Sequence, residues 1–266
     1  MRSPSVALTL VGGPTVLLEV GELRFLTDPT LDPAGSTYTQ GPVSMEKLAA
    51  PALPPEALGR IDAVLLSHDE HADNLDTGGR ALLPRAGRVL TTPSGAGRLG
   101  GNATGLAPWQ SVEVEAGGTR VRVTGVPARH GPEGTEVFLG EVTGFVLEWE
   151  GQEDGALYVS GDTRFFPGVE EIARRFRVGT AVLSVGDAHF EATGPLRLTL
   201  NAKEALQVVR TLGVHTVVPV HLEGWAHYQE APEALRAAFR AEGLQSVLRI
   251  VTAGERVLLG ALAQVA

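Results

Sequence analysis

The feature that most constrains this chain is an apolar run that ends abruptly in a cluster of imidazoles and carboxylates. Residues 61–66 have the pattern of a short buried strand. The next residues, 68–74, hold two histidines, three acidic residues and one asparagine. A packed core does not accommodate so many polar groups, because each buried one needs a partner. A divalent metal ion is a partner for several of them at once, whereas the alternative is a solvated, charged loop.

Further along the chain, other predicted strands also end in histidine or aspartate. Strands in layered α/β proteins end together at one edge of the sheet, where ligands commonly bind. We therefore expect these side chains to meet in space. They are His68, His130, Asp162, His189 and His221.

Periodicity predicts the remaining elements. Three strands are expected at the N-terminus, an antiparallel meander over 111–149, and helices after position 76 and near 95–100, 169–176, 201–212 and 232–241. Strands are also expected at 89–92, 156–160, 180–185, 216–220, 247–251 and 256–259. Segment 30–60 is rich in proline and glycine and is predicted to be a long loop over a site, with at most a short helix at 45–49.

Length and composition set broad limits. The chain has 266 residues, a net charge of -9 and no cysteine. These values predict one domain over 1–266 and exclude disulfides and cysteine-ligated zinc. The negative charge argues against binding to nucleic acid or to anionic membrane. No signal peptide, membrane anchor or spanning segment is predicted, so a cytoplasmic protein is expected.

Nearly the whole chain resembles the metallo-β-lactamase-fold hydrolases, in particular the N-acylphosphatidylethanolamine phospholipase D-like and ascorbate-phosphate lactonase-like branch. The family signature is His-x-His-x-Asp-His after a strand, then a distant His, a bridging Asp and a final His. The resemblance implies an α/β fold, a four-layer αββα sandwich of two mixed β-sheets with a mono- or dinuclear site at one edge. The segments that carry it, beside the 68–74 cluster, are Val11-Gly12-Gly13-Pro14-Thr15, Thr27-Asp28-Pro29, Ser160-Gly161-Asp162-Thr163 and Val218-Pro219-Val220-His221.

By position, the resemblance implies a set of metal ligands. His71 and Asp73 match the second His and the Asp of the signature, and His130 matches the distant His. Asp162 matches the bridging Asp and His221 the final His. Asp28 matches an aspartate that orients a ligand without binding the metal.

Two departures from the signature leave alternatives open. One extra residue separates the two histidines, so either His68 or Asp69 fills the first ligand position, with His68 favoured. Asn74 replaces the last histidine, and it could equally cap the following helix. The second metal site is then weakened, empty or rebuilt from elsewhere, for which His189 and His227 are candidates.

The expected function is metal-assisted hydrolysis of a small molecule. One or two Zn²⁺ ions, or Mn²⁺ or Fe²⁺, would activate a hydroxide toward an ester, lactone or phosphodiester, with Asp73 as the catalytic proton acceptor. A non-catalytic metal-binding protein and a nucleic-acid processing hydrolase are the alternatives. Segment 30–60 and the loop containing Trp225 are expected to wall the pocket. The sequence does not identify the substrate or the oligomeric state.

Overall fold

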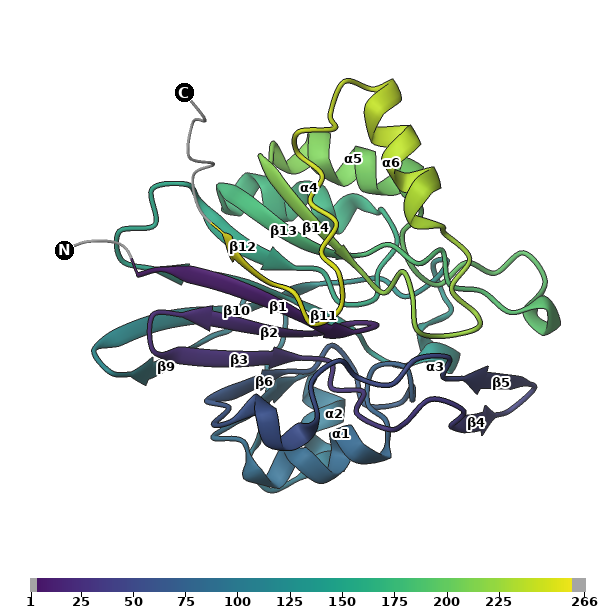
Figure 1. Cartoon of the computed structure of the whole chain (residues 1–266), viewed down its shortest axis with the longest axis horizontal. Helices are drawn as coiled ribbons and strands as arrows, with labels where there is room; N and C mark the ends of the chain where they lie inside the picture. The colour runs from purple at the N-terminus through teal and green to yellow at the C-terminus, as the bar shows by residue number, and fades with distance from the viewer. Residues whose placement is uncertain (1–3, 260–266) are drawn as a thin grey trace.

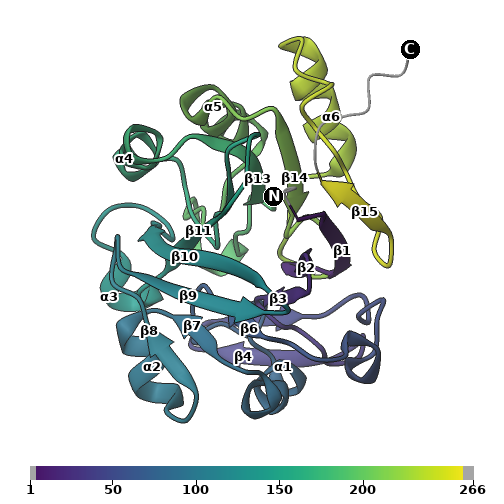
Figure 2. The ribbon, with the colours of Figure 1, turned by 90° about the vertical axis from the view of Figure 1, so that its left-hand side faces the viewer.

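Two mixed β-sheets lie face to face at the centre of the structure, and helices cover their outer faces (Figures 1 and 2). The structure is a computed structural model that describes residues 4–259. Within this range no helix is long and apolar enough to span a lipid bilayer.

The first sheet contains the N-terminal strands. Its order is β15–β1–β2–β3–β6–β7–β8, antiparallel from β15 to β3 and parallel from β3 to β8. The strands are β1 (Val6–Gly12), β2 (Thr15–Val20), β3 (Leu23–Thr27), β6 (Ala63–Leu65), β7 (Val89–Thr91), β8 (Ala103–Gly105) and β15 (Arg256–Leu259).

The second sheet has the order β14–β13–β12–β11–β10–β9, parallel from β14 to β12 and antiparallel from β12 to β9. Its antiparallel half contains the meander predicted over 111–149, but the strand residues expected around Val137 and Leu139 lie instead in the short helix α3 (Glu136–Leu139). The strands are β9 (Ser111–Ala116), β10 (Thr119–Pro127), β11 (Thr143–Trp149), β12 (Ala156–Val159), β13 (Val178–Ser184) and β14 (Thr216–Val220).

Helices α1 and α2 cover the first sheet, and α4, α5 and α6 cover the second (Figure 2). The short helix α3 follows β10 and lies near the edge at which the strands of both sheets end (Figure 1). The helices are α1 (Thr77–Leu82), α2 (Pro93–Leu99), α3 (Glu136–Leu139), α4 (Pro167–Arg175), α5 (Ala202–Leu212) and α6 (Pro232–Ala241), with 3-10 turns η1 (Pro55–Leu58), η2 (Leu83–Arg85) and η3 (Glu191–Thr193).

Three apolar clusters separate the four layers. The central cluster contains inward-facing residues of both sheets, such as Leu8, Phe25 and Phe145. A second cluster packs the other sheet face against α4, α5 and α6, and a third packs the first sheet against α1. A fully buried side chain of this size contributes about 1.5–3 kcal/mol. The expectation of a four-layer αββα sandwich of two mixed sheets is confirmed.

The prediction of a short helix at 45–49 is wrong. Segment 30–60 instead forms a hairpin, β4 (Thr37–Gln40) and β5 (Val43–Glu46), and then the turn η1. The end of β5 is held in an extended form by tertiary pairing, because the amide of Ala226 donates to the carbonyl of Glu46 at 3.0 Å. A bridge between Lys47 and Trp225 continues this pairing, which overrides local preference.

The strand predicted at 247–251 is reduced to a single bridge between Val217 and Leu248. The amide of Val217 donates to Val247, and the amide of Arg249 donates back to Val217. The next donor along this side of β14 would be Pro219, which has no N–H. The ladder therefore stops after one bridge.

A buried ion pair fixes the hairpin to the rest of the molecule. Lys47 Nζ lies 2.8 Å from Asp76 Oδ2, and both side chains are at most 3% exposed. Asp76, rather than Asn74, caps α1, since it accepts a hydrogen bond from the amide of Gly79. It also accepts from the amide of Leu31. One carboxylate thus joins the hairpin, the segment after β3 and the start of α1.

Replacing Lys47 by methionine is expected to lower the free energy of unfolding by about 3 kcal/mol, because Asp76 would remain buried without its cation. Unfolding in guanidinium chloride, followed by tryptophan fluorescence, measures the change. Arg120→Met is the matched control. It removes an ion pair at 2.7 Å to Glu115 in which both side chains are more than half exposed, and a loss below about 1 kcal/mol is expected. Equal losses in the two variants would contradict the prediction.

Candidate metal centre

Four strands from the two sheets end at one edge, and each is followed by residues of a single polar cluster. The segment after β6 brings His71 and Asp73, and the segments after β10, β12 and β14 bring His130, Asp162 and His221. These side chains form two groups, and within each group the candidate ligand atoms all lie within 4.8 Å of one another. The convergence expected from the sequence is therefore present for this set.

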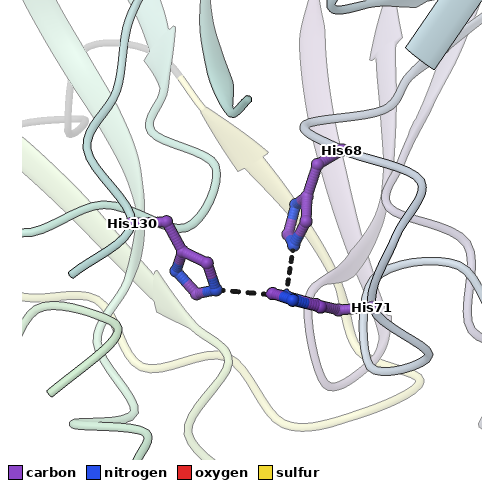
Figure 3. Close-up of side chains that lie close together, drawn as sticks. All are labelled: His68, His71 and His130. Atoms are coloured by element: carbon purple, nitrogen blue, oxygen red, sulfur yellow. Dashed lines mark hydrogen bonds between the residues drawn. The ribbon is translucent and has the colours of Figure 1, made fainter. Parts of the chain in front are cut away.

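The first group consists of three imidazoles whose rings point toward one another (Figure 3). His68 Nε2 lies 2.9 Å from His71 Nδ1, and His130 Nε2 lies 3.1 Å from the same atom. The other nitrogen of His130 donates to the carbonyl of Leu198, and that of His68 faces the Ser67 hydroxyl. Since His130 carries its proton on the outer nitrogen, its inner nitrogen presents a lone pair to the other two rings.

The same surroundings keep these imidazoles uncharged. Burial lowers the pKa of His68 well below its usual value, and the neighbouring His71 and His130 lower it further. Burial and the nearby His130 lower the pKa of His71 to about 4. Burial also lowers the pKa of His130. Neutral imidazole is the form that binds a metal ion.

The second group places two carboxylates around a buried imidazole. His221 Nε2 lies 3.3 Å from Asp73 Oδ2 and 3.3 Å from Asp162 Oδ2. Neither contact has hydrogen-bond geometry, so within residues 4–259 this buried nitrogen has no hydrogen-bond partner. A buried polar atom without a partner is rare, and a bound ion is one arrangement that would satisfy it.

The electrostatics of this group favour a cation. Burial alone would lower the pKa of His221, but Asp162 and Asp73 outweigh it and raise that pKa to about 10. Burial alone would raise the pKa of Asp73, but His227 and His221 hold it well below its usual range. The two carboxylates therefore stay ionised and attract positive charge to the space between them.

The structure separates the two candidates for the first ligand position. His68 is fully buried and faces His71 and His130. Asp69 points away and forms an ion pair with Arg98, with 2.6 Å between Oδ1 and Nη2. The extra residue is accommodated by a turn that brings the His68 ring into the group.

Asn74 lies among carboxylates rather than at the start of α1. As drawn, its amide nitrogen is 3.4 Å from Asp28 Oδ2, and with the amide rotated by 180° it donates to Asp162 at 3.2 Å and to Asp73 at 3.3 Å. Either orientation makes Asn74 a hydrogen-bond donor to buried carboxylates.

Asp28 links the ends of β3 and β6. Its Oδ1 accepts a hydrogen bond of 2.6 Å from the amide of Ser67. Burial raises the pKa of Asp28 to about 8, and the nearby Asp162 adds to the shift. Asp28 therefore contacts the turn that carries His68; the orienting role that the resemblance implies for it stays a prediction.

The two proposed replacements for Asn74 lie in different places. His227 Nε2 is 2.8 Å from Asp73 Oδ2, and its ring stacks on Phe190. His189 is outside the cluster and contacts Arg197, which also pairs with Asp187. Only His227 therefore adjoins the candidate ligands.

The backbone is strained where it enters the site. Four described residues other than glycine have positive φ: Asp28, Asp187 and His221, at 29°, 44° and 59°, each follow a strand at this edge, whereas Trp109, at 74°, lies before β9. Positive φ is costly for such residues and is concentrated at functional sites. At position 161 a glycine is required for steric reasons, since a Cβ there would lie 2.7 Å from the side chain of Ser67, which belongs to the other sheet.

A cavity of about 360 Å³ opens onto both groups of candidate ligands. Its walls come from the β4–β5 hairpin, α3 and the segment 188–198. The hairpin agrees with the prediction that segment 30–60 walls the pocket. Trp225 is not among the lining residues; it is buried and packs against Tyr38, with ring centroids 5.7 Å apart. The aromatic wall residues Phe138 and Phe190 carry no sequence signal that would have singled them out.

The donor set fits divalent metal ions. Three neutral imidazole nitrogens form one group, and two ionised carboxylates with a fourth imidazole form the other. Imidazole and carboxylate donors suit zinc, manganese and iron. The unpartnered His221 Nε2 gives independent support, because a metal ion would supply the partner that it lacks.

A family profile and several known proteins match this chain. The profile of the beta-lactamase superfamily domain matches residues 23–222. A UPF0173 metal-dependent hydrolase from Myxococcus xanthus is 34% identical over 218 residues, which cover 76% of this chain and 70% of that protein. The UPF0173 protein YddR from Bacillus subtilis is 23% identical over 257 residues, covering 93% of this chain and 98% of that one.

Solved structures show the same fold at lower identity. The isothiocyanate hydrolase from Delia radicum gut bacteria superposes with a TM-score of 0.80 at 21% identity, covering 94% of this chain and 98% of that one. Igni18, a metallo hydrolase from Ignicoccus hospitalis, gives a TM-score of 0.70 at 20% identity, covering 96% and 99%. With its superfamily profile and its relatives in agreement, the chain belongs to the beta-lactamase superfamily as one of the UPF0173 metal-dependent hydrolases.

Proposed function

We propose that this enzyme hydrolyses an ester, lactone or phosphodiester bond of a small molecule with the help of one or two divalent ions, of which Zn²⁺ is the first candidate. The observation that carries the proposal is the convergence of six potential ligand side chains, from strand ends of both sheets, four of which line one cavity. We also propose that the enzyme belongs to the phospholipase D-like and lactonase-like branch of the superfamily, because its sequence carries the motifs described above.

We assign His68, His71 and His130 to one ion, and Asp73 and His221 to a second. Asp162 belongs to the second group and is near enough to His130 to affect its ionisation, so it would be the carboxylate shared by the two ions. A divalent ion held there would lower the pKa of a bound water toward about 7 and would polarise a carbonyl or phosphoryl oxygen. We propose that the second ion binds His221 Nε2, which has no hydrogen-bond partner within residues 4–259, rather than Asn74, which donates to the carboxylates.

Asp73 is the proposed catalytic group. Its carboxylate lines the cavity, and His227 donates to its Oδ2 at 2.8 Å. One oxygen is thereby fixed by His227, and the carboxylate is ionised, so that it can orient the attacking water and accept its proton. Asn74 and His227 hold this carboxylate in position.

Metal content will test the ligand assignment without reference to a substrate. We expect the purified wild type to hold up to two equivalents of a divalent metal, measured by mass spectrometry of the elements after purification without chelator. His68→Ala should lose at least one equivalent, because it removes a nitrogen from the imidazole group.

The matched control for His68→Ala is Asp69→Asn at the neighbouring position. Asp69 faces Arg98 rather than the cluster, so this variant should keep the metal content of the wild type. Loss of metal from Asp69→Asn together with full retention in His68→Ala would reverse the assignment.

Asp73→Asn is expected to reduce turnover by about 10²–10⁴-fold, the usual contribution of a general base. Substrate discovery uses a panel of esters, lactones and phosphodiesters with the metal-loaded wild type. Circular dichroism should be unchanged, since asparagine preserves the shape of the buried side chain. Full activity in this variant would refute the role of Asp73, and bound metal without turnover of any substrate would favour a non-catalytic protein.

A further inference from the structure

The walls of the cavity differ in character from its floor. The ionisable lining residues are Asp73, Asp162 and three histidines, all at the candidate metal centre. The remaining lining side chains are apolar, apart from Gln40 and Thr193; they include Val43, Met45, Phe138, Leu139, Phe190, Leu196 and Leu198. The polar chemistry is thus confined to the point where the reaction would occur.

No lysine or arginine is among the described residues that line this cavity. The nearby arginines are engaged elsewhere. Arg98 pairs with Asp69 and Glu70, and Arg197 pairs with Asp187. A carboxylate or phosphate on the substrate, away from the metal ions, would therefore have no cationic partner on the walls.

Phe138 forms part of the mouth of the cavity. It lies on α3, lines the cavity and is 85% exposed, an unusual state for a large apolar side chain. Its neighbour Val137 is 87% exposed but does not line the cavity. Exposed apolar surface beside a pocket marks a place where a ligand is bound. Phe190 and the tip of the β4–β5 hairpin provide further walls.

We propose that the substrate carries an uncharged apolar group, alkyl or aryl, that extends from the reacting bond along these walls and contacts Phe138 at the mouth. The inference rests on the proposed hydrolytic function and narrows it to substrates whose part away from the reacting bond is uncharged and apolar; esters and lactones with such a group are used to test it. The cavity of about 360 Å³ has room for roughly a dozen water-sized groups at about 30 Å³ each, which suits a small molecule.

Substrate series with the metal-loaded full chain test this proposal. The first series is methyl acetate, methyl butyrate and methyl hexanoate, with γ-butyrolactone and γ-octalactone in parallel. We expect kcat/KM to rise about fourfold for each added methylene, the gain from burying one such group. Monomethyl adipate places a carboxylate at the far end of a chain matched to methyl hexanoate, and its kcat/KM should be at least tenfold lower.

Variants at adjacent positions localise the effect. Phe138→Ala should lower the ratio of kcat/KM for methyl hexanoate over methyl acetate by about tenfold, and Phe138→Leu should restore most of it. Val137→Ala is the matched control, because this residue is equally exposed but lies outside the cavity lining. Its ratio should stay within about twofold of the wild type.

Binding gives a readout that does not depend on turnover. Calorimetry should show that 2-heptanone binds to the metal-loaded protein at least tenfold more tightly than 6-oxoheptanoate, its analogue with a terminal carboxylate. This preference without any hydrolysis would support the inference while the proposed function fails. Equal or tighter binding of the anion, or equal turnover of monomethyl adipate and methyl hexanoate, would overturn the inference while hydrolysis stands.

Discussion

The site depends on the burial of three carboxylates at one edge of the sandwich. Asp28, Asp73 and Asp162 are each at most 5% exposed and lie close enough to affect one another's ionisation. Burial raises the pKa of Asp28 to about 8, whereas the neighbouring imidazoles keep Asp73 and Asp162 ionised, and two such buried negative charges would be costly unless donors and cations surrounded them. Backbone amides, the amide of Asn74 and buried imidazoles provide part of this compensation. The proposed metal ions would provide the remainder, so metal binding and the stability of this edge are expected to be coupled.

The architecture explains how residues far apart in sequence can be held so closely. The candidate ligands follow strands of both sheets, and the central apolar cluster fixes those sheets against each other. A hydrogen bond also joins the two sheets directly at this edge, since the amide of Thr143 in β11 donates to the carbonyl of Ser67, after β6, at 3.0 Å. Asp28 then ties β3 to the turn after β6. The ligand positions are therefore set by the packing of the sheets, with little freedom left to the connecting loops.

Much of the fold and of the centre could be predicted from local patterns. Buried strands show as apolar runs, and the His or Asp after them identified the edge and four of the six candidate ligands, together with His189, which lies outside the cluster; His71 and Asp73 came from the resemblance to the family. The choice between His68 and Asp69 could not be made, because it depends on how one turn accommodates an extra residue. The β4–β5 hairpin was not predicted because the end of β5 pairs with Ala226, which is distant in sequence. The strand expected at 247–251 forms a single bridge because its partner strand contains Pro219, which has no N–H to donate. Nor does any spacing reveal that Phe138 lies at the cavity mouth.

The elements that form the cavity walls were predicted less well than the strand ends that carry the candidate ligands. Strand ends place the proposed metal ligands, whereas the hairpin, α3 and segment 188–198 place the cavity walls. The hairpin is joined to the site through the buried pair of Lys47 and Asp76 rather than through the ligands themselves. Wall residues such as Phe138 can therefore change without disturbing the charge balance at the centre. The proposed chemistry and the proposed substrate choice would then be physically separable, because the packing of the sheets places the candidate ligands, whereas the hairpin, α3 and segment 188–198 form the walls.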